Sequence, residues 1–270
     1  MNPVVCVADV RRMIGAVKTD AREFGTNFFL PDAAIELAIR AGSFFALEAA
    51  GVAFFLEREP LFDRVYYSAA DTRCLAGGLS RLGMPDSGAL VTDIVGRPED
   101  TAPWVQPFEA AGFSPYTRFL RMQRIFSGTL PQAGPDPEIE VARESDAQAI
   151  LDAIGENFDA YAEHIPTIQE IRTAASLGTI LLARDAGRVA AILYYDHSGL
   201  TSMLRYWLVL PEYRSLGLGD KLMRRYFQDC AGCRRSVLWV RETNRRAVPI
   251  YRWYGYQPDS TVDTILIKRR

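Results

Sequence analysis

Hydrophobic and polar positions follow two rhythms along residues 138–268. Short runs rich in Val, Ile, Leu and aromatic residues are typical of strands, whereas apolar positions three and four residues apart are typical of amphipathic helices. Read in this way, the pattern predicts strands at 138–143, 179–184, 188–195, 202–210, 236–241 and 263–268. It predicts helices starting near 145 and at 167–177, 218–228 and 246–253. The second half of the chain is therefore expected to form an α+β domain.

Turn and capping residues mark the ends of several predicted elements. Ser145 and Asp146 are favourable N-cap residues just before an apolar helical pattern. The tripeptide Asp185-Ala186-Gly187 separates two strand-like runs and predicts a hairpin. Pro211 closes the next strand, because proline lacks the amide that a ladder requires.

The first half repeats this order of elements. Strand-like runs at 44–49, 52–58 and 64–68 surround the turn at Gly51, and a shift of 136 residues places that turn on Gly187. Further along, Gly112-Phe-Ser-Pro matches Gly255-Tyr-Gln-Pro with a shift of 143 residues. Two such anchors in the same order indicate an internal duplication, and a period this long predicts two related domains.

A linker is expected between the two halves. The segment 127–138 reads SGTLPQAGPDPE, in which three prolines and two glycines interrupt any strand or helix pattern. We place the boundary so that one domain covers 1–131 and the other 132–270. Each is expected to be a mixed, largely antiparallel sheet flanked by helices.

Composition excludes several classes of protein. Apolar residues make up 49% and charged residues 24%, which is typical of a folded chain. The formal net charge of −2 argues against a chain-wide nucleic-acid surface. No apolar run reaches the roughly 20 residues of a membrane-spanning helix. The first ten residues do not resemble a signal peptide, so the four cysteines are interpreted as reduced thiols in the cytoplasm.

The most informative segment follows the strand that ends at Pro211. A tight loop carries Arg214, Gly217 and Gly219, and a helix opens directly after it. Helix N-termini offer unpaired amides, and glycines let a ligand approach the backbone, so the segment predicts an anion site suited to a pyrophosphate. By itself the loop could also be an ordinary strand–helix connection.

A second segment, one strand and one helix later, favours the anion site over an ordinary strand–helix connection. It carries Asn244, Ala247, Ile250, Tyr251 and Gly255 in the pattern Asn-x-x-Ala-x-x-Ile-Tyr-x-x-x-Gly-Tyr. Together with the Arg-x-x-Gly-x-Gly loop, it resembles the two signature motifs of the GNAT superfamily of acyl-CoA-dependent N-acetyltransferases. The resemblance covers roughly residues 138–270.

The resemblance implies a sheet that splays between its fourth and fifth strands and holds coenzyme A there. The pantetheine arm would bind the strand edge, with Asn244 as a further partner, and the pyrophosphate would bind the loop. The implied strand-edge residues are Leu208, Val209 and Leu210. The implied loop residues are Arg214, Ser215, Leu216, Gly217, Leu218, Gly219 and Asp220.

The resemblance also implies direct attack of a neutral amine on the thioester, with Tyr251 protonating the leaving thiolate. A core aromatic is the alternative for Tyr251. The general base stays open, because the strand 202–210 has no carboxylate. The candidates, besides a water relay, are Asp196, His197, Glu242 and His164. Arg205 could bind an acceptor carboxylate or simply face solvent.

The first half has lost the matching residues. The position 143 residues before Tyr251 is Phe108, which cannot donate a proton, and the position before Asn244 is Thr101. Residues 69–78 lack the Arg-x-x-Gly-x-Gly spacing. This half resembles the inactive halves of tandem GNAT proteins, a group that includes mycothiol synthases and glycine N-acyltransferases. It would cover the acceptor cleft in place of a homodimer partner, which implies a monomer or weak dimer.

The sequence thus predicts transfer of an acetyl group from acetyl-CoA to an amine, with a small molecule favoured over a protein and no nucleic acid or membrane as partner. The acceptor could be an amino acid, an aminoglycoside-like amine or a protein amine. Alternatives are a longer acyl-CoA or acyl carrier protein donor, or a non-catalytic acyl-CoA sensor. Cys230 and Cys233 lack a second ligand pair, so no metal is expected.

Overall fold

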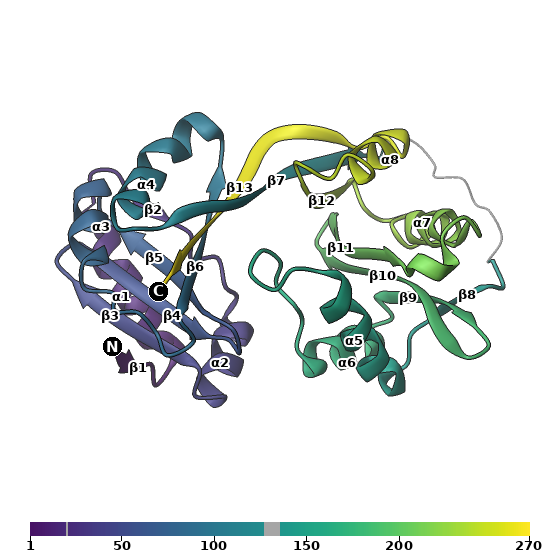
Figure 1. The fold of residues 1–270 in the computed structure, drawn as a ribbon, viewed down its shortest axis with the longest axis horizontal. Helices are drawn as coiled ribbons and strands as arrows, with labels where there is room; N and C mark the ends of the chain where they lie inside the picture. The colour runs from purple at the N-terminus through teal and green to yellow at the C-terminus, as the bar shows by residue number, and fades with distance from the viewer. Residues whose placement is uncertain (20, 127–135) are drawn as a thin grey trace. The chain divides into compact units, whose positions relative to one another are not determined.

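A computed structural model describes residues 1–19, 21–126 and 136–270 (Figure 1). The described chain divides into two compact units. Unit 1 consists of Met1–Phe119 and Ser260–Arg270, and unit 2 consists of Leu120–Asp259. The expected boundary between 131 and 132 lies outside the described residues and stays a prediction. Each unit is described by itself below.

Unit 2 has the predicted alternation of strands and helices. In chain order its elements are β8 (Ile139–Val141), α5 (Ala147–Asn157), α6 (Ile168–Ser176), β9 (Ile180–Asp185), β10 (Arg188–Ser198), β11 (Thr201–Val209), α7 (Leu218–Asp229), β12 (Arg235–Arg241) and α8 (Ala247–Trp253). Short 3-10 turns occupy Glu144–Asp146 and Pro211–Tyr213. The strand order is β12-β11-β10-β9-β8, with only the β11–β12 pair parallel.

Helices cover both faces of the unit 2 sheet. On one face Leu222 and Tyr226 of α7 pack in a core with Tyr251 of α8. On the other face Ile150 of α5 and Ile171 of α6 pack on the sheet. Each helix buries the apolar stripe that its sequence spacing predicts, so the sheet is enclosed by two hydrophobic layers.

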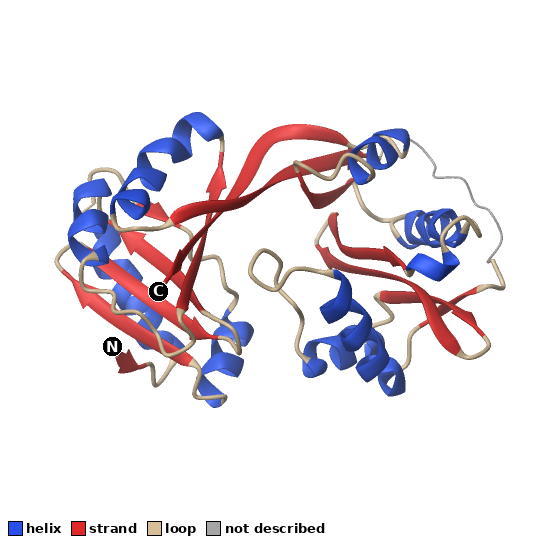
Figure 2. Cartoon of the chain, in the orientation of Figure 1, coloured by secondary structure: helices blue, strands red, loops and turns tan. Residues whose placement is uncertain are grey.

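Unit 1 repeats this architecture. In chain order its elements are β1 (Asn2–Pro3), α1 (Val7–Thr19), β2 (Gly25–Thr26), α2 (Asp32–Arg40), β3 (Phe44–Ala49), β4 (Val52–Arg58), β5 (Asp63–Ala69), α3 (Thr72–Leu79), β6 (Ala89–Gly96) and α4 (Pro98–Ala110). Its strand order is β1-β3-β4-β5-β6, and β5–β6 is again a parallel pair (Figure 2). The matching order confirms the fold class predicted from the repeat.

Two long strands run from one unit into the other. β7 (Ser114–Ile125) starts in unit 1 and ends in unit 2, whereas β13 (Gln257–Arg269) starts in unit 2 and ends in unit 1. β13 pairs antiparallel with β6 over Val262–Arg269 (Figure 1). The sequence pattern places the last strand at 263–268, whereas β13 starts six residues earlier and contains Ser260 with a positive φ.

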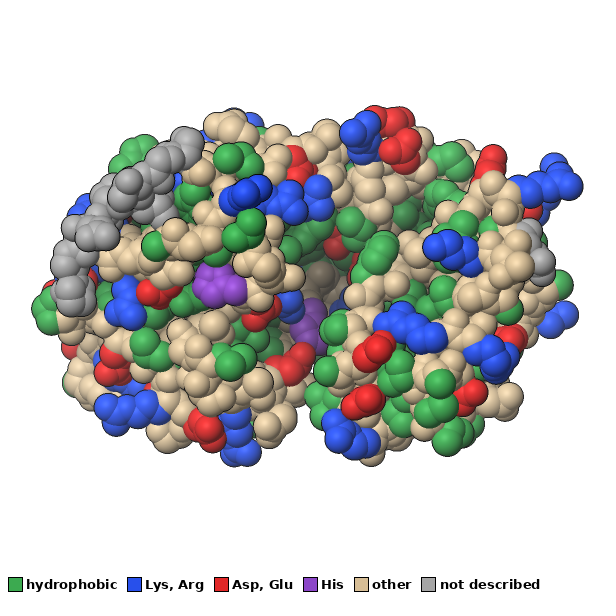
Figure 3. Space-filling model, turned by 180° about the vertical axis from the view of Figure 1, so that it is seen from behind, with side chains coloured by type: hydrophobic (Ala, Val, Ile, Leu, Met, Phe, Trp, Pro, Cys, Tyr) green, Lys and Arg blue, Asp and Glu red, His purple; other side chains and the backbone are tan. Residues whose placement is uncertain are grey.

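The surface agrees with the near-neutral composition. Acidic and basic side chains are interspersed over the face drawn in Figure 3, without a stripe of one sign. Across the part of the chain that the structure covers, no helix combines the length and hydropathy needed to cross a bilayer.

Candidate functional site

The parallel pair in unit 2 separates halfway along its length. β11 pairs with β12 from Thr201 to Leu204, and the pairing ends there. At the same point β11 contains a bulge, since Tyr194 of β10 lies opposite Tyr206, Tyr195 lies opposite Leu204, and Arg205 is the extra residue. A bulge bends its strand, so β11 diverges from β12 and leaves a splay between the two.

The open edge of β11 is formed by alternate residues. The amide of Leu210 donates to Ala190 O at 3.0 Å, so the backbone groups of Leu210 and Leu208 face β10. Those of Val209 and Trp207 therefore face the splay. Of the three implied strand-edge residues, Val209 offers its backbone to the open side. Its carbonyl accepts a hydrogen bond from Arg214 Nε at 3.3 Å.

Unpaired amides gather at the turn that follows β11. Ser215 and Gly217 both have a φ of 76°, and α7 begins directly after them. The amide of Lys221 is the first in this helix with a carbonyl partner outside it, Gly217 O. Within the described residues no acceptor faces the amides of Ser215, Gly217, Leu218, Gly219 and Asp220. Such a row of donors at a helix N-terminus forms an anion site.

The two glycines are required for different reasons. Gly217 has a left-handed conformation that favours glycine, and a Cβ there would point into open space. Gly219 is helical, but a Cβ there would lie 3.2 Å from the Trp207 ring. One glycine therefore allows the turn, and the other allows α7 to pack on β11.

The two charged residues of the loop, Arg214 and Asp220, make different contacts. Arg214 is exposed at the turn. The Asp220 carboxylate accepts a hydrogen bond from Tyr254 Oη at 2.8 Å and pairs with Arg224 at 2.7 Å. Asp220 therefore joins α7 to α8 through its side chain, and its amide is the part directed at the anion site.

Tyr251 lies in the α7–α8 layer beside the splay. Its ring centroid is 5.6 Å from that of Trp207 and 5.9 Å from that of Tyr256. Its hydroxyl makes no hydrogen bond with any residue that the structure describes. Burial raises the pKa of the phenol above its ordinary value, which keeps the proton on the oxygen.

A second polar atom near Tyr251 lacks a partner. Trp207 Nε1 is buried, with no acceptor in the described parts of the chain. Buried donors are normally satisfied, so an orphaned indole N–H beside an open strand edge is suited to a ligand carbonyl. The sequence did not single out Trp207, because an aromatic residue in a strand is indistinguishable from core.

Asn244 caps the helix that carries Tyr251. Its Oδ1 accepts a hydrogen bond from the amide of Ala247 at 3.0 Å, and the residue is exposed. Capping explains why asparagine suits this position. Its implied contact with pantetheine stays a prediction.

The base candidates are not gathered in one place. Asp196 and His197 lie opposite Met203 and Ser202, where β11 is still paired with β12, and Asp196 forms an ion pair with Arg205 at 3.3 Å. The His197 ring lies 3.5 Å from the Cys233 thiol.

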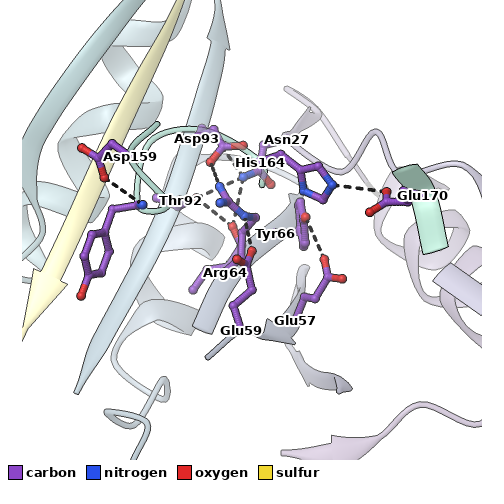
Figure 4. Close-up of polar contacts among 12 residues, drawn as sticks. Asn27, Glu57, Glu59, Arg64, Tyr66, Thr92, Asp93, Asp159, His164 and Glu170 are labelled. Carbon is purple, nitrogen blue, oxygen red and sulfur yellow. Dashed lines mark hydrogen bonds and ion pairs between the residues drawn. The ribbon is translucent and has the colours of Figure 1, made fainter. Parts of the chain in front are cut away.

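The other two candidates lie elsewhere in unit 2. Glu242 is exposed directly after β12. His164 is on the α5–α6 loop, where its carbonyl accepts a hydrogen bond from Tyr206 Oη and its ring lies 3.4 Å from Glu170 (Figure 4).

The same loop brings two carboxylates that the sequence analysis missed. Arg241, at the end of β12, pairs with Asp159 at 2.8 Å and with Glu163 at 3.6 Å. Burial raises the pKa of Glu163, with Arg241 opposing the rise. Since Tyr206 holds the loop to β11 and Arg241 holds it to β12, the loop spans the open end of the splay. No local motif marks Glu163, because its environment comes from distant strands.

The corresponding splay in unit 1 is filled by the chain itself. β5 and β6 pair only at Asp63 and Arg64, and β4 occupies the other edge of β5 along its whole length. β2 pairs with β5 at Ala69 and Ser68, so it lies on the edge that faces β6. A strand of the protein therefore takes the place that is open in unit 2.

Asn27, directly after β2, bonds to both sides of this filled splay. Its Nδ2 donates to Val65 O at 3.2 Å on β5 and to Asp93 O at 2.9 Å on β6, and its Oδ1 accepts from the amide of Tyr67 (Figure 4). Gly25 in β2 lies so close to Trp104 that a Cβ would be 2.3 Å from the ring. β2 and Asn27 together form a plug in this splay, and the plug is packed tightly against the rest of unit 1.

The positions of unit 1 that correspond to the anion loop and to Tyr251 also differ from those of unit 2. The N-terminus of α3 is capped by Asp71, whose carboxylate accepts from the amide of Cys74 at 2.8 Å. An internal anion therefore occupies the helix end. Phe108 is fully buried on α4 between Tyr67 and Phe113.

Comparison with known proteins agrees with this geometry. Residues 147–256 match the model of the family described as Acetyltransferase (GNAT) family. The sequence has no significant match among curated proteins.

Solved structures share the fold at low identity. A GCN5-related N-acetyltransferase from Sphaerobacter thermophilus is 16% identical, with 81% of this chain and 76% of that chain covered and a TM-score of 0.61. A tandem GNAT protein from the clavulanic acid biosynthesis pathway is 11% identical, with 99% and 97% covered and a TM-score of 0.57. A GNAT acetyltransferase from Colwellia psychrerythraea is 12% identical, with 99% and 98% covered and a TM-score of 0.55.

Proposed function

Because residues 147–256 match the acetyltransferase (GNAT) family, we propose that the protein transfers an acetyl group from acetyl-CoA to a primary amine. The observation that carries the proposal is the meeting of two unsatisfied features in unit 2. The free edge of β11 leads directly into the row of unpaired amides at the start of α7.

These features fit the two polar parts of coenzyme A. Amide groups of the pantetheine arm would extend the sheet at Val209 and Trp207, as an added strand does. The pyrophosphate would bind the amides from Ser215 to Asp220, with Arg214 as the nearby cation. Trp207 Nε1 supplies a donor that has no acceptor within the described residues.

The side chains near the splay have separate roles in the proposed reaction. When bound, the thioester supplies an acyl carbonyl open to attack by a neutral amine. Tyr251 holds a proton on its hydroxyl for the departing sulfur. Glu163 and His164, on the loop that contacts β11 and β12, are candidates for binding the amine or taking its proton. Donors aimed at the developing oxyanion would complete the site.

An assay of thiol release tests the proposal. Purified protein is mixed with acetyl-CoA and a panel of amino acids, aminoglycosides and lysine peptides, and free coenzyme A is measured. We expect release that depends on one class of amine, and calorimetry should give one coenzyme A per chain. Binding without release for any amine would favour a non-catalytic acyl-CoA sensor. Mass spectrometry of copurified thioesters distinguishes acetyl from longer acyl donors.

A small amine is the acceptor we favour over a protein, with unit 1 in place of a homodimer partner. The four cysteines are free thiols. A cytoplasmic location remains part of the proposal.

A further inference from the structure

A buried arginine lies at the centre of a charged row in unit 1. Arg64 of β5 lies opposite Val91 of β6, and Asp93 is two residues further along β6 on the same face. In the next strand, β13, Asp263 lies opposite Val95, so it is a diagonal neighbour of Asp93 on that face. The three side chains thus follow one another across three adjacent strands.

The hydrogen bonds of Arg64 leave part of its guanidinium unused. Its Nη1 donates to Asp93 at 2.9 Å and its Nε donates to Glu59 at 3.0 Å (Figure 4). Its side chain is only 5% exposed, yet Nη2 has no partner in the described chain. A buried, unused donor on a charged group is costly, so an acceptor is expected there.

Asp263 carries a buried acceptor, just as Arg64 carries a buried donor. Its Oδ1 is buried and likewise unpartnered among the described residues. Burial raises the pKa of this carboxyl well above its ordinary value, and Asp93 adds to the rise while Arg64 opposes it. A carboxylate in such surroundings requires a nearby cation.

The balance of charge decides what could satisfy both atoms. Among these three described carboxyl groups, those of Glu59 and Asp93 pair with the one guanidinium, while the raised pKa of Asp263 means that it ionises only beside a further cation. A second anion would be repelled, whereas an ammonium group would be attracted. The orphaned Nη2 requires an oxygen acceptor, and a neutral oxygen avoids the repulsion.

We propose that Arg64, Asp93 and Asp263 form a binding site in unit 1 for a small primary ammonium ion with a neutral oxygen a few bonds away, as in an amino alcohol or an amino amide. The ammonium group donates to Asp263 and Asp93, and the oxygen accepts from Arg64 Nη2. The row reaches the surface at Asp93 and Glu59, whose side chains are 26% and 22% exposed. The site does not depend on coenzyme A binding or on acetyl transfer in unit 2.

Calorimetry on the full chain with matched ligands tests the chemistry. Ethanolamine and glycinamide carry both groups, ethylamine lacks the oxygen, N-acetylethanolamine lacks the ammonium group, and glycine replaces the neutral oxygen with a carboxylate. We expect the first two to bind at least tenfold more tightly than the other three. Equal affinity for ethylamine would overturn the role of Arg64, and failure of both ethanolamine and glycinamide to bind would overturn the site.

A pair of variants on one strand tests the location. Asp263→Asn keeps the shape of the side chain and removes its charge, so we expect a loss of affinity of at least tenfold. Asp259→Asn removes a carboxylate of the same strand that pairs with Arg121 in unit 2, and it should leave affinity unchanged. Retained affinity in Asp263→Asn contradicts the proposal. Thermal melting of both variants establishes that they are folded.

Discussion

The two units contain the same splay, and only one of them leaves it open. In unit 2 the edge of β11 beyond Leu204 faces the splay, and no strand of the described chain pairs with it there. In unit 1 the corresponding edge of β5 is covered by β2 and bridged to β6 by Asn27. The fold is therefore shared, while the capacity to bind a ligand depends on a short segment that lies outside the repeated elements.

The helix that follows the splayed strand, α7 after β11 and α3 after β5, differs between the units in the same way. α7 begins with a row of amides that have no acceptor in the described structure, whereas α3 begins with the carboxylate of Asp71 already bound to its first turn. An anion from solution can bind the first helix end but would compete with a covalently attached anion at the second. Unit 1 thus fills with its own residues both places that are open in unit 2.

Tyr251→Phe gives unit 2 the residue type that unit 1 carries at Phe108. Of all the changes considered, we expect this one to have the largest effect. General-acid groups typically contribute about 10²–10⁴-fold in rate, so we expect kcat to fall by that factor with the affinity for coenzyme A nearly unchanged. Steady-state kinetics with the best amine and calorimetry provide the two measurements.

Tyr254→Phe is the matched control for that variant. It removes a hydroxyl from the residue that ends the same helix, but one that already bonds to Asp220 and so is not poised as a proton donor. Wild-type turnover in Tyr251→Phe would assign the proton to another residue or to water. Loss of coenzyme A binding would make Tyr251 a structural residue.

Removing the bridge in unit 1 should strongly reduce stability. Asn27→Ala leaves Val65 O, Asp93 O and the amide of Tyr67 without their side-chain partner in a buried site. Each buried polar group left unpaired costs about 1–3 kcal/mol, so we expect the free energy of unfolding to fall by roughly 2–5 kcal/mol. Urea denaturation measures this change.

Asn244→Ala in unit 2 is the comparison for the bridge. The Asn244 side chain is exposed and bonds only to the amide of Ala247 within the described structure, so its loss should cost about 1 kcal/mol. Equal effects of the two substitutions would mean that Asn27 is not the residue that closes the splay of unit 1.

Adding a side chain to the anion loop should weaken coenzyme A binding by at least about tenfold. Gly217→Val places a branched group in the space before the unpaired amides, and Gly219→Val forces Trp207 to shift. A lost hydrogen bond to a charged group is worth about 1.5–3 kcal/mol.

Gly187→Val is the control for backbone strain. Gly187 also has a positive φ, but it lies in the turn between β9 and β10. We expect it to lower stability and leave affinity unchanged. Unchanged affinity in folded Gly217→Val and Gly219→Val proteins would reduce the loop to a connector.

The smallest expected effect concerns Glu170 at low pH. Although burial opposes ionisation, hydrogen bonds from His164 and Thr167 lower the pKa of Glu170 from 4.5 to about 2. The ionised group therefore stabilises the fold above about pH 4.5, and this contribution is lost as the pH falls toward 2. Glu170→Gln should flatten acid unfolding in that range, followed by circular dichroism. The exposed Glu156→Gln should not, and equal curves would argue against the His164 contact.

The sequence predicted features with local causes. Helix periodicity, the turn at Gly187, the glycines after Pro211 and the repeat all depend on neighbouring residues, and they predicted the fold class correctly. The plug formed by β2 and Asn27 was missed, because its hydrogen bonds reach residues 38 to 66 positions away. Trp207 and Glu163 were missed for the same reason, since their surroundings are assembled by distant strands.

The crossing of β13 has a consequence for how the protein forms in the cell. The edge of β6 receives its partner from Val262 to Arg269, which a ribosome adds well over a hundred residues after β6 itself. At a synthesis rate of about 5–20 residues per second, unit 1 waits for its last strand for on the order of ten seconds or more. During that interval β6 exposes an unpaired strand edge, the kind of surface that chaperones bind and that promotes aggregation. Unit 1 should therefore reach its native state only after Val262–Arg269 has been synthesised and has left the ribosome.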